Sequence, residues 1–223
     1  MTTHTSNYFD LASRLPANTV VAFHNVGWDE YEELLLQVGE SSGMRISFDN
    51  GSLQIMTTSP EHERYASFIE RLVSTLSLQL RINILFFGSA TIKKRGNRKG
   101  NEPDCCFYVQ TATAIGNRMH LDFEVDPPPD IAVEVDLHHD SRPKFPIYAG
   151  LGLPEIWRFD GIKLTIYLLE DDHYRESATS VALPMLTSVI LTDFLSRLSH
   201  DNDLEILLAF DEWLKSLSRW ALF

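Results

Sequence analysis

The sequence contains little cysteine and no apolar run long enough to span a membrane. Its two cysteines, Cys105 and Cys106, are adjacent, and neighbouring side chains in a strand point to opposite faces, so we expect no disulfide between them. Two cysteines do not form a zinc framework either, and thiols in a reducing compartment explain them. Residues 1–10 combine neither a basic start nor an apolar stretch, so we expect no signal peptide and a cytoplasmic protein.

Positive charge is also scarce. The 223 residues include 19 Lys and Arg against 31 Asp and Glu, which gives a net charge of -12. Such a chain repels polyanions at long range, and this counts against tight nonspecific binding to nucleic acid. With 44% hydrophobic residues, the chain can bury a globular core.

Apolar periodicity and turn residues predict alternating helices and strands. Asp29 with Glu32 forms a capping-box pattern, and Ser59 before Pro60 indicates the start of the longest helix. We therefore predict a mixed α/β fold with a central mixed sheet flanked by helices. The expected helices are 29–38, 61–80, 142–149, 191–198 and 203–217; the expected hairpins are 44–56 and 163–177; the expected single strands are 82–88, 102–110, 130–136 and 155–159.

Two carboxylate motifs interrupt apolar strand patterns. Glu102-Pro103-Asp104 is followed thirty positions later by Glu134-Val135-Asp136. A carboxylate in a central strand is costly to bury unless it is paired or binds a cation, and Mg²⁺ prefers such oxygen ligands. The alternative is that Asp104 caps a turn after Pro103 and that Glu134 lies on a solvated face.

A basic cluster precedes the Asp104 strand. It holds five of the nineteen basic residues within seven positions. A loop that binds phosphate beside a site of phosphodiester cleavage has this composition, although a solvated loop tip has it too. The cluster consists of Lys93, Lys94, Arg95, Arg98 and Lys99.

Four segments together resemble a known family. They are 88–91 (GSAT), 102–108 (EPDCCFY), 127–136 (PPPDIAVEVD) and 147–158 (IYAGLGLPEIWR). Across roughly residues 28 to 198, the sequence resembles the Uma-two family of restriction-endonuclease-like proteins, within the PD-(D/E)XK nuclease superfamily. The resemblance implies an extension over 1–27, a restriction-endonuclease-like domain over 28–200 and a C-terminal helix over 201–223.

The same resemblance implies an endonuclease that cleaves DNA with Mg²⁺ or Mn²⁺. Asp104 matches the motif aspartate and Glu134 the glutamate of the Glu-x-Lys element, so both are expected to bind metal and to be catalytic. An acidic residue on the preceding helix often completes the metal site in this superfamily, and Glu63 is the candidate, ahead of Glu61 and Glu70.

The sequence departs from the superfamily at Asp136, which stands where the lysine of Glu-x-Lys belongs. An aspartate does not supply the positive charge that orients the attacking water. Because some members carry this lysine on a neighbouring helix, Lys144 is the expected catalytic lysine, with Arg142 as its substitute. Asp136 could instead be a third metal ligand. The alternative function is a catalytically degenerate module that keeps the fold and binds nucleic acid or protein.

Two further features leave alternatives open. His62, His138 and His139 could serve as a general base, or they could be ordinary surface histidines. The C-terminal segment 203–217 is more apolar than a solvated helix should be. It either covers the sheet or forms a homodimer contact, and a homodimer is expected by analogy with nucleases that cut both strands.

Overall fold

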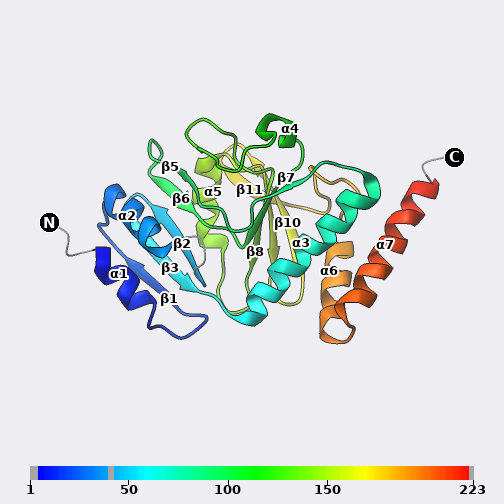
Figure 1. The fold of residues 1–223 in the computed structure, drawn as a ribbon, viewed down its shortest axis with the longest axis horizontal. Helices are drawn as coiled ribbons and strands as arrows, with labels where there is room; N and C mark the ends of the chain where they lie inside the picture. The colour runs from blue at the N-terminus through cyan, green and yellow to red at the C-terminus, as the bar shows by residue number, and fades with distance from the viewer. Residues whose placement is uncertain (1–4, 40–42, 221–223) are drawn as a thin grey trace.

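The computed structural model, which describes residues 5–39 and 43–220, has two β-sheets side by side (Figure 1). The N-terminal sheet is antiparallel, with the strand order β1-β3-β2-β6-β5. The main sheet has the order β11-β10-β9-β8-β7-β4 and is mixed, because β8 and β9 are parallel. The mixed α/β class predicted above is confirmed. The division of the strands between two sheets was not predicted.

The strands of the N-terminal sheet are β1 (Val20–Phe23), β2 (Met44–Asp49), β3 (Ser52–Thr57), β5 (Ile92–Lys94) and β6 (Lys99–Asn101). The main sheet contains β4 (Leu85–Phe86), β7 (Cys105–Tyr108), β8 (Ile131–Val135), β9 (Glu155–Phe159), β10 (Leu164–Glu170) and β11 (His173–Ser177). Both hairpins follow the sequence prediction. In the first, Asn50 and Gly51 both have positive φ, as a tight two-residue turn requires.

The helices α1 (Thr5–Ala12) and α2 (Trp28–Val38) cover one face of the N-terminal sheet. The capping interaction of α2 differs from the prediction. The helix begins one residue early, so Glu30 occupies the third position and accepts a 2.7 Å hydrogen bond from the Gly27 amide. The side chains of Asp29 and Glu32 are free to bind basic residues from β5 and the turn after it.

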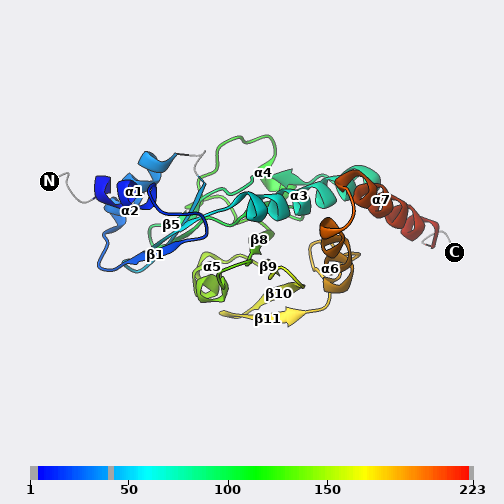
Figure 2. The same cartoon turned by 90° about the horizontal axis from the view of Figure 1, so that it is seen from below.

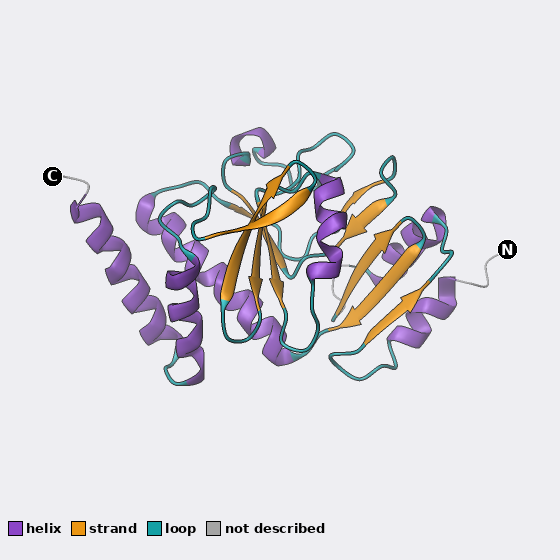
Figure 3. Cartoon of the chain, turned by 180° about the vertical axis from the view of Figure 1, so that it is seen from behind, coloured by secondary structure: helices purple, strands orange, loops and turns teal. Residues whose placement is uncertain are grey.

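The main sheet lies between helices. The helices α3 (Pro60–Leu80), α6 (Ser188–Ser196) and α7 (Asp203–Trp220) pack with one face of the sheet around Trp157. The opposite face packs on α5 (Phe145–Leu151), and Figure 2 shows α5 and α6 on opposite sides of the strands. The short elements are α4 (Ala112–Ile115), η1 (Arg142–Lys144) and η2 (Arg197–Ser199). Helix α5 also lies between the strands of the two sheets (Figure 3).

Helix α7 covers its own domain. Ile206, Phe210 and Leu214 of this helix are fully buried in the core that α3 and α6 share. Leu204 and Leu208 remain exposed at 64% and 56%, so a homodimer through this helix would use these side chains and stays a prediction. Among the described residues, no helix has the length and apolar character needed to cross a membrane.

The chain crosses from one sheet to the other at the first carboxylate motif. Strand β6 ends at Asn101 and strand β7 begins at Cys105, so Glu102-Pro103-Asp104 forms the connection. The strand predicted over 102–110 is therefore shorter than expected. The predicted strand over 82–88 is also short, because only Leu85–Phe86 pairs with β7. The basic cluster predicted as a loop or hairpin end is the β5–β6 hairpin.

Candidate active site

The two predicted carboxylates lie beside each other on the main sheet. Glu134 is in the central strand β8 and is 1% exposed, while Asp104 is 5% exposed. The Asp104 amide donates to the Val133 carbonyl oxygen over 2.9 Å, and the Val135 amide donates to Asp104 Oδ2 over 2.7 Å. These bonds flank Glu134 and hold Asp104 against the same strand. Burial rules out the alternative of a solvated Glu134.

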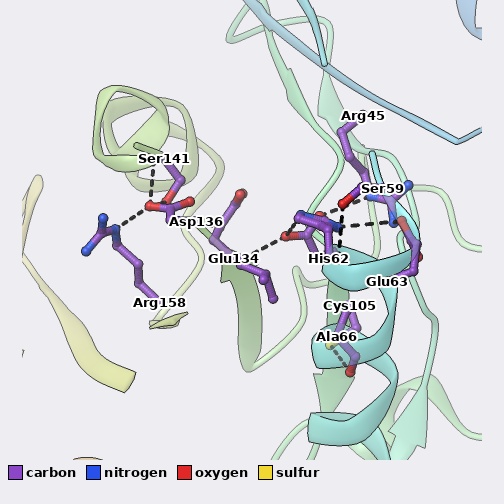
Figure 4. Close-up of polar contacts among 12 residues, drawn as sticks. Arg45, Ser59, His62, Glu63, Ala66, Cys105, Glu134, Asp136, Ser141 and Arg158 are labelled. Carbon is purple, nitrogen blue, oxygen red and sulfur yellow. Dashed lines mark hydrogen bonds and ion pairs between the residues drawn. The ribbon is translucent and has the colours of Figure 1, made fainter. Parts of the chain in front are cut away.

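Asp104 is surrounded by positive charge. Arg45 Nε donates to Asp104 Oδ1 over 3.2 Å, and His62 Nε2 lies 3.0 Å from Asp104 Oδ2. The same guanidinium donates from Nη2 to Glu63 Oε1 over 2.8 Å. His62 Nδ1 lies 3.7 Å from that Glu63 oxygen. One arginine and one histidine therefore join the motif aspartate to the helix glutamate (Figure 4).

Local structure explains why these side chains meet. In β2, Ile46 and Phe48 point into the cluster under α2, so the alternation of the strand directs Arg45 to the opposite face. The start of α3 is fixed by Ser59, whose hydroxyl accepts a 3.3 Å hydrogen bond from the His62 amide. That cap places His62 and Glu63 in the first turn of the helix, facing Asp104.

Glu134 has its own set of donors. Lys144 Nζ donates to Glu134 Oε2 over 3.2 Å, and Asn101 Nδ2 donates to Oε1 over 3.3 Å. The Tyr148 hydroxyl also donates to Oε1. The three donors come from η1, β6 and α5, so the Glu134 carboxylate is bound by both sheets and by the helix between them.

Burial and nearby charges shift the pKa values of Glu134 and Lys144. Burial, together with the nearby charges of Asp104 and Asp136, raises the pKa of Glu134. Burial opposes the charge of Lys144, but Glu134 and Asp104 outweigh that effect and raise the lysine pKa. A divalent cation would relieve the repulsion among the carboxylates.

In the first turn of α3, the pKa of a histidine is raised and the pKa of a glutamate is lowered. Burial disfavours the charged form of His62, but the contacts with Asp104 and Glu63 raise its pKa to about 9. The contact with His62, followed by the charge of Arg45, lowers the pKa of Glu63 to about 2 against the effect of burial. These contacts favour the protonated form of His62 over the neutral form that a general base needs.

Asp136, in the usual lysine position, has partners of its own that differ from those of Glu134. Its Oδ2 accepts hydrogen bonds of 2.8 and 3.0 Å from the amide and hydroxyl of Ser141, and another from Arg158. Figure 4 shows Asp136, Ser141 and Arg158 on one side of Glu134, with the His62 cluster on the other. These partners already bind the Asp136 carboxylate, which is unfavourable for the role of third metal ligand.

The other predicted substitutes lie outside the site. Arg142 donates to Asp140 and is largely exposed, whereas Lys144 reaches Glu134. His138 is exposed, and His139 contacts the Asn18 carbonyl oxygen at 2.7 Å. Lys144 is therefore the cation that the structure brings to Glu134 from the segment after β8.

Part of the basic cluster is neutralised within the chain. Lys93 Nζ lies 2.7 Å from Glu32 Oε1. Arg95 lies 2.9 Å from Asp29 and also pairs with Glu32. These two basic residues hold the β5–β6 hairpin against α2, so their charge is partly neutralised by acidic residues of the protein.

The rest of the cluster differs in its surroundings. Lys99 Nζ lies 2.7 Å from Asp49 Oδ1. Arg98 is exposed and Lys94 is half-buried, and neither forms an ion pair within residues 5–39 and 43–220. These two side chains are the members of the cluster available to an outside anion.

Three residues of the site were not predicted from the sequence: Arg45, Asn101 and Tyr148. Arg45 interrupts an apolar strand, and a charged residue in such a strand is a signal that could have been read as functional. Asn101 directly precedes the Glu102-Pro103-Asp104 motif, but nothing in its type indicates a partner. Tyr148 is buried in the apolar cluster around α5, and its hydroxyl binds Glu134.

The residues present fit a hard divalent cation. Asp104 and Glu134 supply carboxylate oxygens, and Mg²⁺ typically takes one or two carboxylates from a protein. The amide oxygen of Asn101 is buried, and no donor reaches it within the described part of the chain. Over the same residues, no group of three His, Cys, Asp or Glu side chains is arranged to hold a metal. Two carboxylates and one amide oxygen are thus the donors that fit.

A cavity of about 980 Å³ lies beside Glu102, the first residue of the Glu102-Pro103-Asp104 motif. Its lining includes Glu102, Met44 and Thr91. Glu102 is 9% exposed, and burial raises its pKa while the charges of Arg45 and Lys144 lower it. The cavity therefore borders the charged cluster through Glu102.

Comparison with known proteins gives two matches of different weight. The family described as "Uma2: Putative restriction endonuclease" matches residues 28–205. Among solved structures, a crystal structure titled as a putative nuclease belonging to DUF820 from Anabaena variabilis is 13% identical, with a TM-score of 0.49. That alignment covers 73% of this chain and 97% of the other. A search of curated proteins gives no match. Because the family match extends over most of its length, the chain belongs to the Uma2 family of putative restriction endonucleases.

Proposed function

We propose that this protein is an endonuclease that hydrolyses phosphodiester bonds of DNA and depends on Mg²⁺ or Mn²⁺. The observation that carries the proposal is the pair of buried carboxylates, Asp104 and Glu134, each within 3.2 Å of a cationic side chain. Buried carboxylates beside fixed cations are typical of catalytic sites, and burial raises the pKa of Glu134. Membership of the Uma2 family supports the nuclease class.

Asp104 and Glu134 would hold the cation, with the Asn101 amide oxygen as a further donor. A bound divalent cation lowers the pKa of water and stabilises the charge that develops on the phosphate. Lys144 would supply the positive charge that a lysine two residues after Glu134 supplies elsewhere in the superfamily. From 3.2 Å, it can orient a water molecule beside Glu134 and stabilise the oxyanion. The hydrogen bond from the Tyr148 hydroxyl favours the ionised form of Glu134, against the effect of burial.

Nucleic acid would meet the protein through a small number of charges. In the cluster formed by Lys93, Lys94, Arg95, Arg98 and Lys99, two members, Lys94 and Arg98, form no ion pair with any described residue, and we propose them as phosphate contacts. Lys93, Arg95 and Lys99 would contribute less, because each already has an acidic partner. Few phosphate contacts imply weak nonspecific binding, which agrees with the net charge of -12.

One alternative function has a specific observation in its favour. In a catalytically degenerate member, Arg45 and Lys144 would serve as permanent counter-charges of Asp104 and Glu134, so that no metal is needed. Such a protein would bind nucleic acid or a protein partner without cleaving it. This alternative requires that added metal leaves the protein unchanged.

The test is plasmid cleavage by the purified chain in Mn²⁺ and in EDTA. The parent is expected to cleave only with metal, and Glu134→Gln and Asp104→Asn are expected to be inactive while retaining their circular dichroism. Glu61→Gln, on the exposed face of the same helix turn as His62, is the control and should cut like the parent. Failure of the parent over a range of metals and salt concentrations would favour the degenerate module.

A further inference from the structure

A single arginine links two acidic side chains of the candidate active site. Arg45 donates from Nε to Asp104 over 3.2 Å and from Nη2 to Glu63 over 2.8 Å. Its third nitrogen, Nη1, donates to the Met44 carbonyl oxygen over 3.1 Å. Each nitrogen of the guanidinium therefore has an acceptor, and only 6% of the residue is exposed. The group is fixed in place.

This linkage bears on how many cations the site can bind. Phosphodiesterase sites with two cations need carboxylates that both ions can share. Asp104 is anchored beside Glu134 through the Val135 amide, so it could bridge a first cation and a second one near Glu63. The Asp104 oxygen on that side accepts from Arg45, and Glu63 is bound to the same guanidinium.

Charge leads to the same conclusion. A guanidinium is not deprotonated in proteins, so Arg45 carries a permanent positive charge. In a site as buried as this one, like charges a few ångströms apart repel much more strongly than they do in water. A second divalent cation at this position would face that charge.

We propose that the site binds one divalent cation, at Asp104 and Glu134, and that Arg45 takes the place between Asp104 and Glu63 that a second cation would otherwise fill. This inference rests on the proposed function, because it assigns the stoichiometry of that same site. Arg45 is a positioning residue: it acts through the two carboxylates. Glu63 is then the acceptor that orients Arg45 and does not ligate the bound cation.

The choice of arginine follows from its shape. A guanidinium presents a planar fork of donors, and here that fork spans Asp104, Glu63 and a backbone carbonyl oxygen at once. A lysine at this position keeps the charge but not the fork. Arg45→Lys should therefore still exclude a second cation, while Arg45→Met should admit it.

The experiment is Mn²⁺ titration of the full chain by calorimetry, with the electron paramagnetic resonance spectrum recorded at saturation. The parent and Arg45→Lys are expected to bind one Mn²⁺ per chain, with the signal of an isolated ion. Arg45→Met is expected to bind two, with the broadened signal of a coupled pair. Adding Glu63→Gln to Arg45→Met should return the count to one.

Glu63→Gln alone keeps the test decisive if Arg45→Met does not fold. This variant is expected to bind one Mn²⁺ with an affinity within about threefold of the parent, and a tenfold loss would make Glu63 a ligand and overturn the inference. Two Mn²⁺ ions in the parent would overturn it and leave the proposed function intact. A single ion in folded Arg45→Met would also overturn it. No Mn²⁺ binding by the parent would overturn both.

Discussion

Lys144 Nζ lies 3.2 Å from Glu134 Oε2, although the two residues are ten positions apart in the chain. The lysine approaches from η1, the turn that precedes α5, and both partners are buried. The charge that Asp136 does not provide thus reaches the glutamate from the next helical segment. We propose that Lys144 in this way takes the role of the lysine that the sequence lacks at position 136.

Replacing Lys144 with methionine should affect activity and stability together. Loss of a charge that stabilises the developing oxyanion costs about 10²–10³-fold in rate. Leaving Glu134 buried without its counter-charge costs about 3 kcal/mol of unfolding free energy. Plasmid cleavage and urea unfolding measure the two effects, and the exposed Lys163→Met is the control. Parent-like cleavage by Lys144→Met would remove this lysine from the mechanism.

Two tyrosines allow a comparison of hydrogen bonds to charged and neutral acceptors. The Tyr148 hydroxyl donates to the Glu134 carboxylate, and the Tyr174 hydroxyl donates to the Leu153 carbonyl oxygen. Tyr148→Phe should lower the unfolding free energy by about 2 kcal/mol and Tyr174→Phe by about 1 kcal/mol, because bonds to charged groups are stronger. Urea unfolding measures both. Equal losses would mean that Tyr148 does not stabilise the ionised glutamate.

The His62 cluster should make the stability of the metal-free protein depend on pH. The pKa of His62 is raised from 6.5 to about 9, so its contribution is complete below pH 6.5 and declines as the pH rises through about 9. The pKa of Glu63 is lowered from 4.5 to about 2, so its contribution is complete above pH 4.5 and declines as the pH falls towards 2.

Urea unfolding in EDTA at about pH 6 and about pH 9 tests the alkaline arm. The parent should lose more stability over this interval than His62→Gln does. His173→Gln, at an exposed histidine, should behave like the parent. If the two variants decline alike, the contact with Asp104 does not stabilise the fold.

The basic side chains of the β5–β6 hairpin should divide into those that bind DNA and those that pair with acidic residues of the protein. Replacing Lys94 and Arg98 with glutamine should reduce the dependence of log affinity on log salt by about 1 per lost contact. Replacing Lys93 and Arg95 should leave that slope almost unchanged and lower stability instead, because these residues pair with α2. Fluorescence anisotropy with labelled duplex DNA measures the slopes, and equal slopes for the two double variants would contradict the division.

Much of the architecture follows from local sequence patterns. Asn50-Gly51 is typical of a tight hairpin turn, and Ser59-Pro60 predicted the start of α3. The apolar run around Glu134 predicted the central strand β8. Each of these signals depends on residues close together in the chain. The resemblance then led to Asp104, Glu134 and Lys144, which the fold places in one charged cluster.

The rest depends on contacts between distant parts of the chain. The separation into two sheets occurs where Glu102-Pro103-Asp104 leaves β6. Pro103 cannot donate to a sheet ladder, but no local pattern shows that the next strand joins a different sheet. Arg45 lies 59 positions from Asp104, and only the packing of the two sheets brings them together. The pairing of Lys93 with Glu32 spans 61 positions and was equally hidden.

The side chains that surround Asp104 and Glu134 come from distant parts of the chain, so the site forms only when these parts have folded together. Arg45 and Asn101 come from the N-terminal sheet. His62 and Glu63 come from α3. Lys144 and Tyr148 come from η1 and α5, which follow β8 in the chain. A fragment that ends before Lys144, or one in which the two sheets have not docked, lacks donors to at least one carboxylate. Under the proposed function, an unfinished chain would therefore have no complete site with which to cut DNA.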